Sequence, residues 1–250
     1  MRRIIVLAAA AAAAVAGFAI VAPAASAAAT CSGGVFTGVN VSGGLVVTGA
    51  CVYHNSTISG GVTVTSTGGF EIESSSVSGG VTVQSGGEFD VDHTLSSGLT
   101  TGNHSSVSGG IKFAGIDMDL IGATVTGGTT ISSQGSGAIP TVCGSTLDSL
   151  TVSGITGTFA AMPIGDPGEV LEAGPVPDCP GNTLTSSLTI TNSHNVEIES
   201  NFIGGSVHIS NSTQIELAGN TIKGSAQCTN VTTATDGDAA PNTVGGSNNC

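Results

Sequence analysis

Ile58-Ser59-Gly60-Gly61-Val62-Thr63-Val64 is repeated 19 positions later as Val77-Ser78-Gly79-Gly80-Val81-Thr82-Val83. The same interval separates the strand-like segment at 70–73 from its acidic counterpart at 89–92. A fixed short period indicates stacked structural units whose neighbours bury a shared core. The repeat therefore predicts a solenoid. The interval returns near the C-terminus, between 188–190 and 207–209 and between 196–198 and 215–217.

Each unit reads as an apolar residue, Ser or Thr, two glycines and a short β-branched strand. Glycine at a fixed site supplies a positive φ or a close backbone approach where the chain turns a corner. The residues that follow alternate between apolar and polar, as strands with one buried face do. A hairpin meander or a β-sandwich also uses short strands, but neither explains a constant register. We expect an all-β, single-stranded parallel β-helix with coils of about 19 residues, whose first strands begin near residues 45, 62, 81, 99, 111, 129, 150, 188, 207 and 226.

The first 27 residues read as a secretory signal peptide and not as part of the fold. Met1-Arg2-Arg3 supplies positive charge, residues 4–22 are apolar, and Pro23-Ala24-Ala25-Ser26-Ala27 offers a small-residue cleavage site. An uncleaved membrane anchor is the alternative, because the apolar run is nearly long enough to span a bilayer. We expect cleavage, secretion, a β-solenoid domain at 28–250 and no membrane contact after cleavage.

The charge balance of residues 28–250 excludes one large class of partners. Both arginines lie in the expected signal, so Lys112 and Lys223 stand against 17 acidic residues, a net charge of −15 with His neutral. Nucleic acids and anionic lipid surfaces are bound by clustered Lys and Arg. We therefore expect no nucleic-acid partner, and the sequence leaves the extracellular partner or surface unidentified.

All six cysteines lie in the part expected to be exported, where disulfides persist. The segments 220–225 and 242–247 match at a spacing of 22, which also separates Cys228 from Cys250. Strands about 4.8 Å apart bring such equivalent side chains within disulfide reach. The first coils are expected to be joined in the same way, and the remaining pair to close a central insertion. The expected disulfides are Cys31–Cys51, Cys143–Cys179 and Cys228–Cys250.

The repeated Val-Ser/Thr-Gly-Gly units and the C-terminal pattern carry a resemblance to known proteins. The pattern runs Gly219-Asn220-Thr221-Ile222, Cys228, Asn242-Thr243-Val244-Gly245-Gly246 and Cys250. In these features the chain resembles the parallel β-helix proteins, and more closely the small secreted bacterial β-helix proteins of no assigned activity. The resemblance covers nearly all of residues 28–250. It implies a right-handed solenoid and carries no reaction with it.

A row of threonines is expected on the outward side of the first strands. If Val62 and Val64 point inward, Thr63 points outward. Such a row could bind ice or a crystalline polymer, although Thr is also simply a good residue for an exposed strand. An ice-binding surface is expected to have paired columns, and the second column holds only Thr48, Thr65, Thr191 and Thr229. The positions equivalent to Thr63 hold Thr82, Thr100, Thr130, Thr151 and Thr189, interrupted by Val46, Lys112, His208 and Gln227.

A second outward row, on the second strand of each coil, is expected to be acidic. Like charges on neighbouring strands repel, so a bridging Ca²⁺ would stabilise the row, because hard cations prefer oxygen ligands. Solubility and the prevention of lateral association are the alternative role. The candidate metal ligands are Glu71, Glu73, Asp90, Asp92, Asp117, Asp119, Glu197, Glu199 and Glu216.

A polysaccharide-degrading hydrolase or lyase is the enzymatic alternative, since several parallel β-helix families cleave acidic polysaccharides. Glycoside hydrolysis needs two positioned carboxylates, but these acids repeat along a row and do not converge on a cleft. A lyase acting on uronates needs Arg or Lys to hold its substrate, and residues 28–250 contain no Arg. The five histidines form no i, i+4 pair. We therefore expect no catalytic residues and no enzyme.

The unit spacing changes at two places. It shortens to 12 between residues 99 and 111, which indicates a truncated coil, and it lengthens at 155–186, where five of the eight prolines gather. The second stretch reads as a loop insertion, and solenoid insertions gather on one face as binding loops. Its acids, Asp166, Glu169, Glu172 and Asp178, favour a cationic patch or a divalent ion. The sequence as a whole predicts a non-catalytic extracellular structural or binding scaffold, as a cell-surface or adhesion component.

Overall fold

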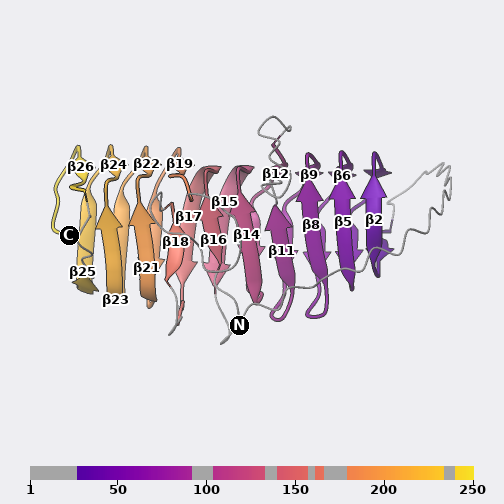
Figure 1. The fold of residues 1–250 in the computed structure, drawn as a ribbon, viewed down its shortest axis with the longest axis horizontal. Helices are drawn as coiled ribbons and strands as arrows, with labels where there is room; N and C mark the ends of the chain where they lie inside the picture. The colour runs from indigo at the N-terminus through magenta and orange to yellow at the C-terminus, as the bar shows by residue number, and fades with distance from the viewer. Residues whose placement is uncertain (1–26, 92–103, 133–139, 157–160, 166–178, 234–239) are drawn as a thin grey trace.

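A parallel β-solenoid makes up the described part of the protein. The computed structural model describes residues 27–91, 104–132, 140–156, 161–165, 179–233 and 240–250. Each strand pairs in parallel with the equivalent strand one coil later, and three faces run along the rod (Figure 1). In these ranges the chain forms no helix, so none there is long and apolar enough to cross a membrane.

The first face is built from the strands that follow the glycine pairs. Ten successive coils each contribute one strand to this face, and these strands pair in register. The longer strands continue around a corner, so they also contribute to a neighbouring face. The strands of the first face are β1 (Ala29–Cys31), β4 (Leu45–Val47), β7 (Val62–Val64), β10 (Val81–Val83), β13 (Ile111–Phe113), the ends of β15 (Thr124–Ser132) and β17 (Thr146–Ser153), β20 (Leu188–Thr191), and the beginnings of β23 (Val207–Ala218) and β25 (Ala226–Thr233).

Two further sets of strands complete each coil. The second face contains β2 (Gly34–Thr37), β5 (Ala50–His54), β8 (Gly69–Glu73), β11 (Glu88–Val91), β14 (Asp117–Ile121), β16 (Thr141–Cys143), β18 (Met162–Ile164), β21 (His194–Glu199) and the end of β23. The third face contains β3 (Asn40–Val41), β6 (Thr57–Ser59), β9 (Ser76–Ser78), β12 (Ser106–Ser108), the beginnings of β15 and β17, β19 (Thr183–Leu184), β22 (Phe202–Ile203), β24 (Thr221–Ile222) and β26 (Thr243–Val244).

The predicted first strands agree with the structure at nine positions and are wrong at one. The strand predicted near residue 99 is not part of the first face, because β10 pairs directly with β13 through Val81 and Ile111. Residue 99 itself lies outside the described residues. The level that the prediction missed is β1, which pairs with β4. The interval between β10 and β13 is therefore one coil with an insertion and not a full coil followed by a truncated one.

The stretch 155–186, read from the sequence as a loop, also supplies strands. Its β18 pairs with β16 and β21 on the second face, and its β19 pairs with β17 and β22 on the third. The interval from β17 to β20 thus contains a complete coil. The prolines of the described residues do not prevent this, because Pro163 lies within β18 and Pro180 precedes β19.

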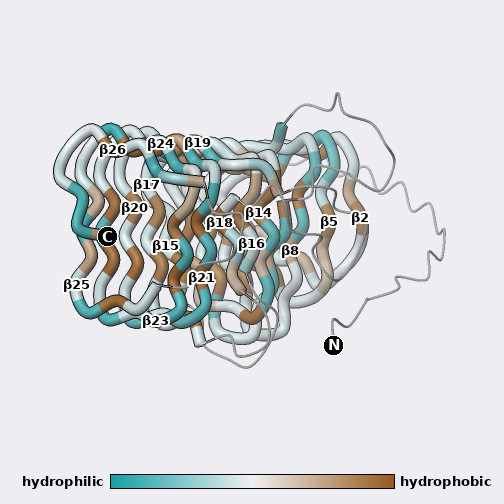
Figure 2. Tube along the Cα trace, turned by 60° about the vertical axis from the view of Figure 1, so that its left-hand side comes forward, coloured by the Kyte–Doolittle hydropathy of each residue, from teal (hydrophilic) through white to brown (hydrophobic). Residues whose placement is uncertain are grey.

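The core is a set of stacked apolar columns inside the coils. Buried and more exposed side chains alternate along the strands. Figure 2 shows hydrophobic residues of neighbouring coils lying side by side along the rod. Aromatic rings stack at the N-terminal end, where the Phe36 and Tyr53 centroids lie 4.8 Å apart and those of Phe70 and Phe89 lie 5.6 Å apart. Each inward residue packs against its equivalents in the coils before and after.

The glycine pairs form the corner between the third and first faces. Gly79 has a φ of +101°, and a Cβ built on it would lie 2.7 Å from the backbone nitrogen of Gly61 in the preceding coil. Any larger residue would therefore be strained by its backbone conformation and would also push adjacent coils apart. This explains why the repeat keeps Gly-Gly at this point.

A buried polar ladder runs along the corner between the second and third faces. At every level except the one before Ala123, the backbone N–H donates to a side-chain oxygen of the equivalent residue in the next coil, as Ser56 N–H does to Ser75 Oγ at 3.0 Å. Asn replaces Ser in the C-terminal half, where the amides also donate to one another and to backbone carbonyls. The residues of this corner ladder are Ser56, Ser75, Ser105, Ser145, Asn182, Asn201, Asn220 and Asn242, with Ala123 as a break.

The three predicted cysteine pairs lie at disulfide distance. The Cα–Cα separations are 6.4 Å for Cys31–Cys51 and 4.9 Å for both Cys143–Cys179 and Cys228–Cys250. Cys228 and Cys250 occupy equivalent levels, as expected from their spacing, because Ala226 bridges Asn248. The first pair is arranged differently from the expectation: Cys31 lies on the first face and Cys51 on the second, so this disulfide crosses the interior between adjacent coils.

We predict that Asn201→Ala lowers the free energy of unfolding by about 2–4 kcal/mol, because it leaves several buried polar groups without partners. Asn201 Oδ1 accepts the Asn182 backbone N–H at 2.8 Å, and its Nδ2 donates to the Ile164 carbonyl at 2.7 Å. Chemical denaturation measures the change. Asn201→Ser should lose less, since Ser performs this role in the N-terminal coils, and exposed Thr183→Ala should change little. An Asn201→Ala variant as stable as the wild type would contradict a stabilising ladder.

Candidate functional site

The acidic residues on the second face lie in a different register from the one expected. Glu71, Asp90 and Asp119 are direct neighbours in one outward row. Asp117 pairs with Glu88 in the adjacent row, and Glu88 was missed because only the acids of the repeated strand motif were considered. The insertion between β10 and β13 hides this register from the sequence. Asp92 lies outside the described residues.

The acidic row is not continuous along the rod. Thr141 follows Asp119 at the next level, and Pro163 precedes Glu197 and Glu216. Within the described residues, no group of three or more His, Cys, Asp or Glu side chains could hold a metal ion. The Ca²⁺ prediction therefore has no assembled three-ligand site to rest on in this part of the chain.

The second face is also poorly accessible at several outward positions. Val52, Thr141 and Glu216 are 9%, 1% and 4% exposed although they occupy the outward row. Burial raises the pKa of Asp90 well above its ordinary value, and the charges of Asp119, Asp117 and Glu71 raise it further. The Asp119 backbone N–H, which donates to Asp90 Oδ1 at 3.2 Å, opposes this shift.

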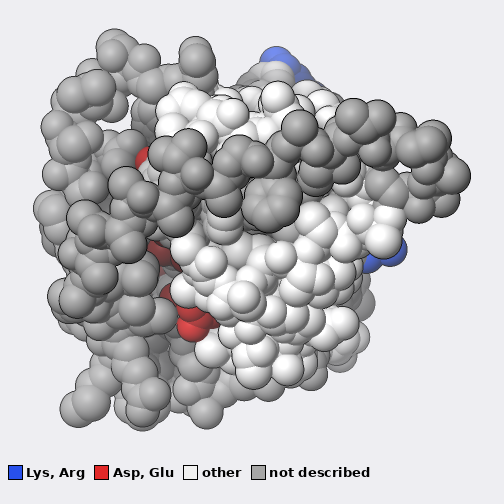
Figure 3. All heavy atoms as spheres, turned by 90° about the vertical axis from the view of Figure 1, so that its right-hand side faces the viewer, with Lys and Arg blue, Asp and Glu red and all other residues white. Residues whose placement is uncertain are grey.

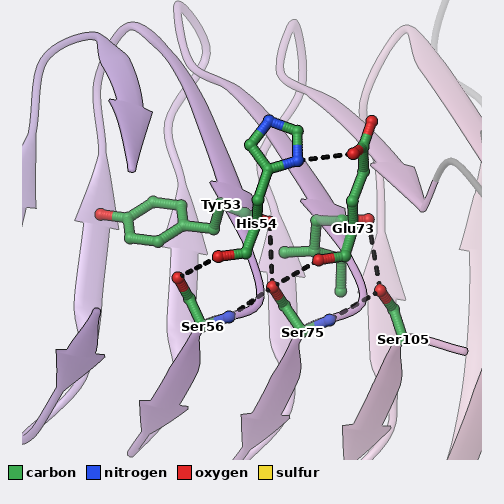
Figure 4. A network of polar contacts seen from close by, with 7 residues as sticks. Tyr53, His54, Ser56, Glu73, Ser75 and Ser105 are labelled. Carbon is green, nitrogen blue, oxygen red and sulfur yellow. Dashed lines mark hydrogen bonds and ion pairs between the residues drawn. The ribbon is translucent and has the colours of Figure 1, made fainter. Parts of the chain in front are cut away.

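His54 and Glu73 form a contact that sequence reasoning missed. Glu73 lies 19 positions after His54, one coil away, and the two side chains meet at 2.5 Å between Nδ1 and Oε2. Figure 4 shows the pair above the corner ladder. A carboxylate on one ring nitrogen orients an imidazole as in a catalytic triad. The neighbouring hydroxyls are used elsewhere, since Ser56 and Ser75 donate to the His54 and Glu73 backbone carbonyls at 2.8 Å.

The outward row of the first face is a mixed row. Its register differs from the prediction in two places: Lys112 follows Thr82 directly, and Thr30 begins the row. Thr100 lies outside the described residues. Lys112 interrupts its centre, and both its neighbours in the row are threonines. A projecting ammonium group prevents this row from acting as one flat hydroxyl surface. In order along the rod, the row consists of Thr30, Val46, Thr63, Thr82, Lys112, Thr130, Thr151, Thr189, His208 and Gln227.

The third face carries the paired hydroxyl columns that the first face lacks. Its short strands place one apolar residue inward, such as Ile58 or Val77, and the residues on either side outward. The residues on the outer side pair in register through six coils, and those on the inner side pair through the first four, from Ser59 to Thr126. Between β15 and β17 the register shifts after Val125, so Asp148 and Thr185 extend the inner side beyond this irregularity. We call these outward residues the hydroxyl grid: an outer column of Thr57, Ser76, Ser106, Thr124, Thr146 and Thr183, and an inner column of Ser59, Ser78, Ser108, Thr126, Asp148 and Thr185.

The hydroxyl grid is an open and nearly uncharged surface. Nine of its twelve residues are exposed and three are half-buried. Asp148 is its single ionisable residue, and that carboxylate is engaged, accepting the Gly127 backbone N–H at 2.6 Å and the Thr185 hydroxyl at 3.3 Å. Phe202 follows Thr183 in the outer column and ends it. The sequence does contain a signal for the first four residues of the inner column, because each is the Ser or Thr before a glycine pair.

A shallow hollow adjoins the grid at the N-terminal coils. Its volume is about 310 Å³, and polar side chains dominate its lining. Thr57, Ser76 and Ser106 of the outer column form one side, and Asn55 and His104 lie on the corner beside them. The hollow therefore extends the hydroxyl surface around the corner toward the second face and does not form a separate enclosed site.

Charge is distributed unevenly over the three faces. Of the ten acidic residues in the described part of the chain, nine lie on the second face and Asp148 alone lies on the third. Viewed from the N-terminal end, acidic atoms appear on one side of the rod and basic atoms on the others (Figure 3). The predicted loop residues Asp166, Glu169, Glu172 and Asp178 lie outside the described residues.

Comparison with protein families, with characterised proteins and with solved structures finds no match to this chain. The site must therefore be judged from its own geometry.

We predict that Asp90→Asn stabilises the protein at neutral pH, by an amount that shrinks as the pH falls toward about 4. A pKa raised by folding means that the folded state holds the proton more tightly, so stability is lost as the pH rises through the folded pKa. The substitution removes the charge and keeps the acceptor for the Asp119 N–H. Urea unfolding at a series of pH values measures the effect.

The half-buried Glu88→Gln variant is the matched control, because it removes one negative charge from the adjacent row of the same face. If both variants gain stability equally, general charge repulsion is responsible and the specific burial of Asp90 is not. A gain for Asp90→Asn that grows on acidification would contradict the direction of the shift.

Proposed function

We propose that this chain is a non-catalytic extracellular binding scaffold that attaches to an extended, uncharged surface through its third face. One observation carries the proposal: an outer column of hydroxyls stays in register through six successive coils on an exposed face, and an inner column accompanies it through the first four. Such a surface has no deep pocket for a small ligand, and it repeats at the strand spacing of about 4.8 Å. A ligand that makes many similar contacts side by side suits it best.

The arrangement of the remaining polar groups supports a binding role over a catalytic one. The acids of the second face lie in rows, and the hydroxyls nearest to the His54–Glu73 pair donate to backbone carbonyls. A solenoid with a disulfide near each end and one at its centre is a rigid support. Rigid presentation favours binding, because little conformational freedom remains to be lost on contact.

Export from the cell belongs to the same proposal. The disulfides are compatible with an oxidising compartment, and residues 1–27 have the composition of a signal peptide. We predict that the protein recovered from the culture medium of a secreting host begins at Ala28, as N-terminal sequencing would determine. Recovery only in the membrane fraction, with Met1 retained, would favour the anchor alternative and contradict this prediction.

We predict that the wild-type protein is depleted from solution by at least one insoluble uncharged solid, from a panel of crystalline cellulose, chitin and ice. The variants Ser108→Tyr and Thr126→Tyr should bind about ten-fold less, since a bulky ring at the centre of the grid separates the surfaces. Aromatic residues are good strand formers, so the fold should tolerate them.

The matched control is Thr130→Tyr, which places the same exposed side chain on the first face. It should bind like the wild type. Equal loss in all three variants, or no adsorption of the wild type to any of the solids, would refute attachment through the third face.

A further inference from the structure

We propose that the solid recognised by the hydroxyl grid is ice, an inference that rests on the proposed attachment through the third face. The grid holds a single ionisable residue, Asp148, in a strongly acidic protein. It offers side-chain hydroxyls in a flat array, and it lacks the projecting lysine that interrupts the first face. Ice is the uncharged solid whose surface consists entirely of groups that such hydroxyls bind.

The geometry of the grid is two-dimensional, and it is regular over the four coils from β6 to β15. Its columns lie two residues apart along each strand, which corresponds to about 6.6 Å, and its rows repeat from coil to coil at about 4.8 Å. The register is continuous from β6 to β15, where Ser59, Ser78, Ser108 and Thr126 succeed one another in the inner column. Water molecules bound at successive positions are thereby held in a plane at fixed mutual distances.

The chemistry of the grid favours water over sugar as the surface to be recognised. A hydroxyl that binds a sugar must first release its own water, so the net gain of each contact is small. Carbohydrate surfaces are usually bound with the help of aromatic side chains that supply apolar contact area. This chain has no Trp, its single Tyr is buried, and Phe202, at the edge of the grid, lies next to the Lys223 ammonium.

With ice as the ligand, the hydration layer of the grid does not have to be displaced. The waters held by the hydroxyls become part of the solid, and each additional row adds a contact without a new loss of rotational freedom. The inward neighbours of the grid residues, among them Ile58, Val107 and Leu147, are at most 1% exposed and fix the backbone beneath them. Eleven weak hydroxyl contacts can then act together.

The charge distribution provides a second, independent reason. Nine of the ten acids in the described residues are on the second face, although each strand of the third face such as β6 also presents two outward positions. Ionised groups are strongly hydrated and incompatible with incorporation into a lattice of neutral water. Asp148, the one carboxylate in the grid, accepts two hydrogen bonds from the protein itself and so has fewer oxygen lone pairs directed at the solvent.

The test is partition of the fluorescently labelled protein into a slowly growing ice front. The wild-type protein should be enriched in the ice over the remaining liquid, and Ser108→Tyr and Thr126→Tyr should reduce the enrichment about ten-fold. Thr130→Tyr should leave it unchanged. The circular dichroism spectrum of every variant should match that of the wild type, which shows that any loss is not caused by unfolding.

The outcomes separate this inference from the proposed function. If the wild type is excluded from ice but adsorbs to crystalline cellulose or chitin, and the grid variants abolish that adsorption, ice recognition is refuted and the scaffold function stands. If the wild type adsorbs to none of these solids, both fall. Enrichment in ice that Thr130→Tyr abolishes and the grid variants preserve would assign the activity to the first face and overturn the inference.

Discussion

The register of coil on coil is the constraint on which the rest of this structure depends. It is held at one corner by the buried ladder of Ser and Asn side chains, in which each backbone N–H donates to the next coil. Each oxygen in the ladder is placed to accept at one position of the neighbouring coil. A shift by a single residue would leave buried donors unpaired and turn apolar residues outward. The ladder therefore sets which residues share a column on every face.

At the opposite corner, the glycine pairs allow the coils to approach. A Cβ at Gly79 would lie 2.7 Å from the Gly61 backbone nitrogen, so the coil spacing there depends on the absence of a side chain. The two corners act together, because one specifies the register and the other permits the spacing. The positions of the outward residues are therefore fixed by the two corners and not by contacts between the outward side chains. Substitutions in a surface column should leave the spacing of that column unchanged.

The sequence predicts this architecture well because two features can be read directly along the chain. They are the interval between repeated segments and the alternation of apolar and polar residues within each strand. The motif at 58–64 and its repeat at 77–83 are sufficient to place β7 and β10, and the 22-residue interval suffices for Cys228–Cys250. The sequence does not show which strands pair with each other across an insertion. Nothing in the sequence of residues 92–110 tells how many of them belong to the regular coil. The false strand near residue 99 and the misplaced Asp117 both follow from this.

The hydroxyl grid was missed for a different reason. Strands of the third face such as β6 and β9 are three residues long and contain one apolar residue, so they show no alternation to detect. Their Ser and Thr residues read as parts of a turn. Only the pairing of whole coils reveals that they form columns. The charge pattern then acquires a physical meaning. Nine of the ten acids in the described residues lie on the second face, where they repel other copies over a screening length of about 8–10 Å. The third face has one acid, Asp148, which is held by two hydrogen bonds from the protein, so this face suits the proposed approach to a solid of neutral water.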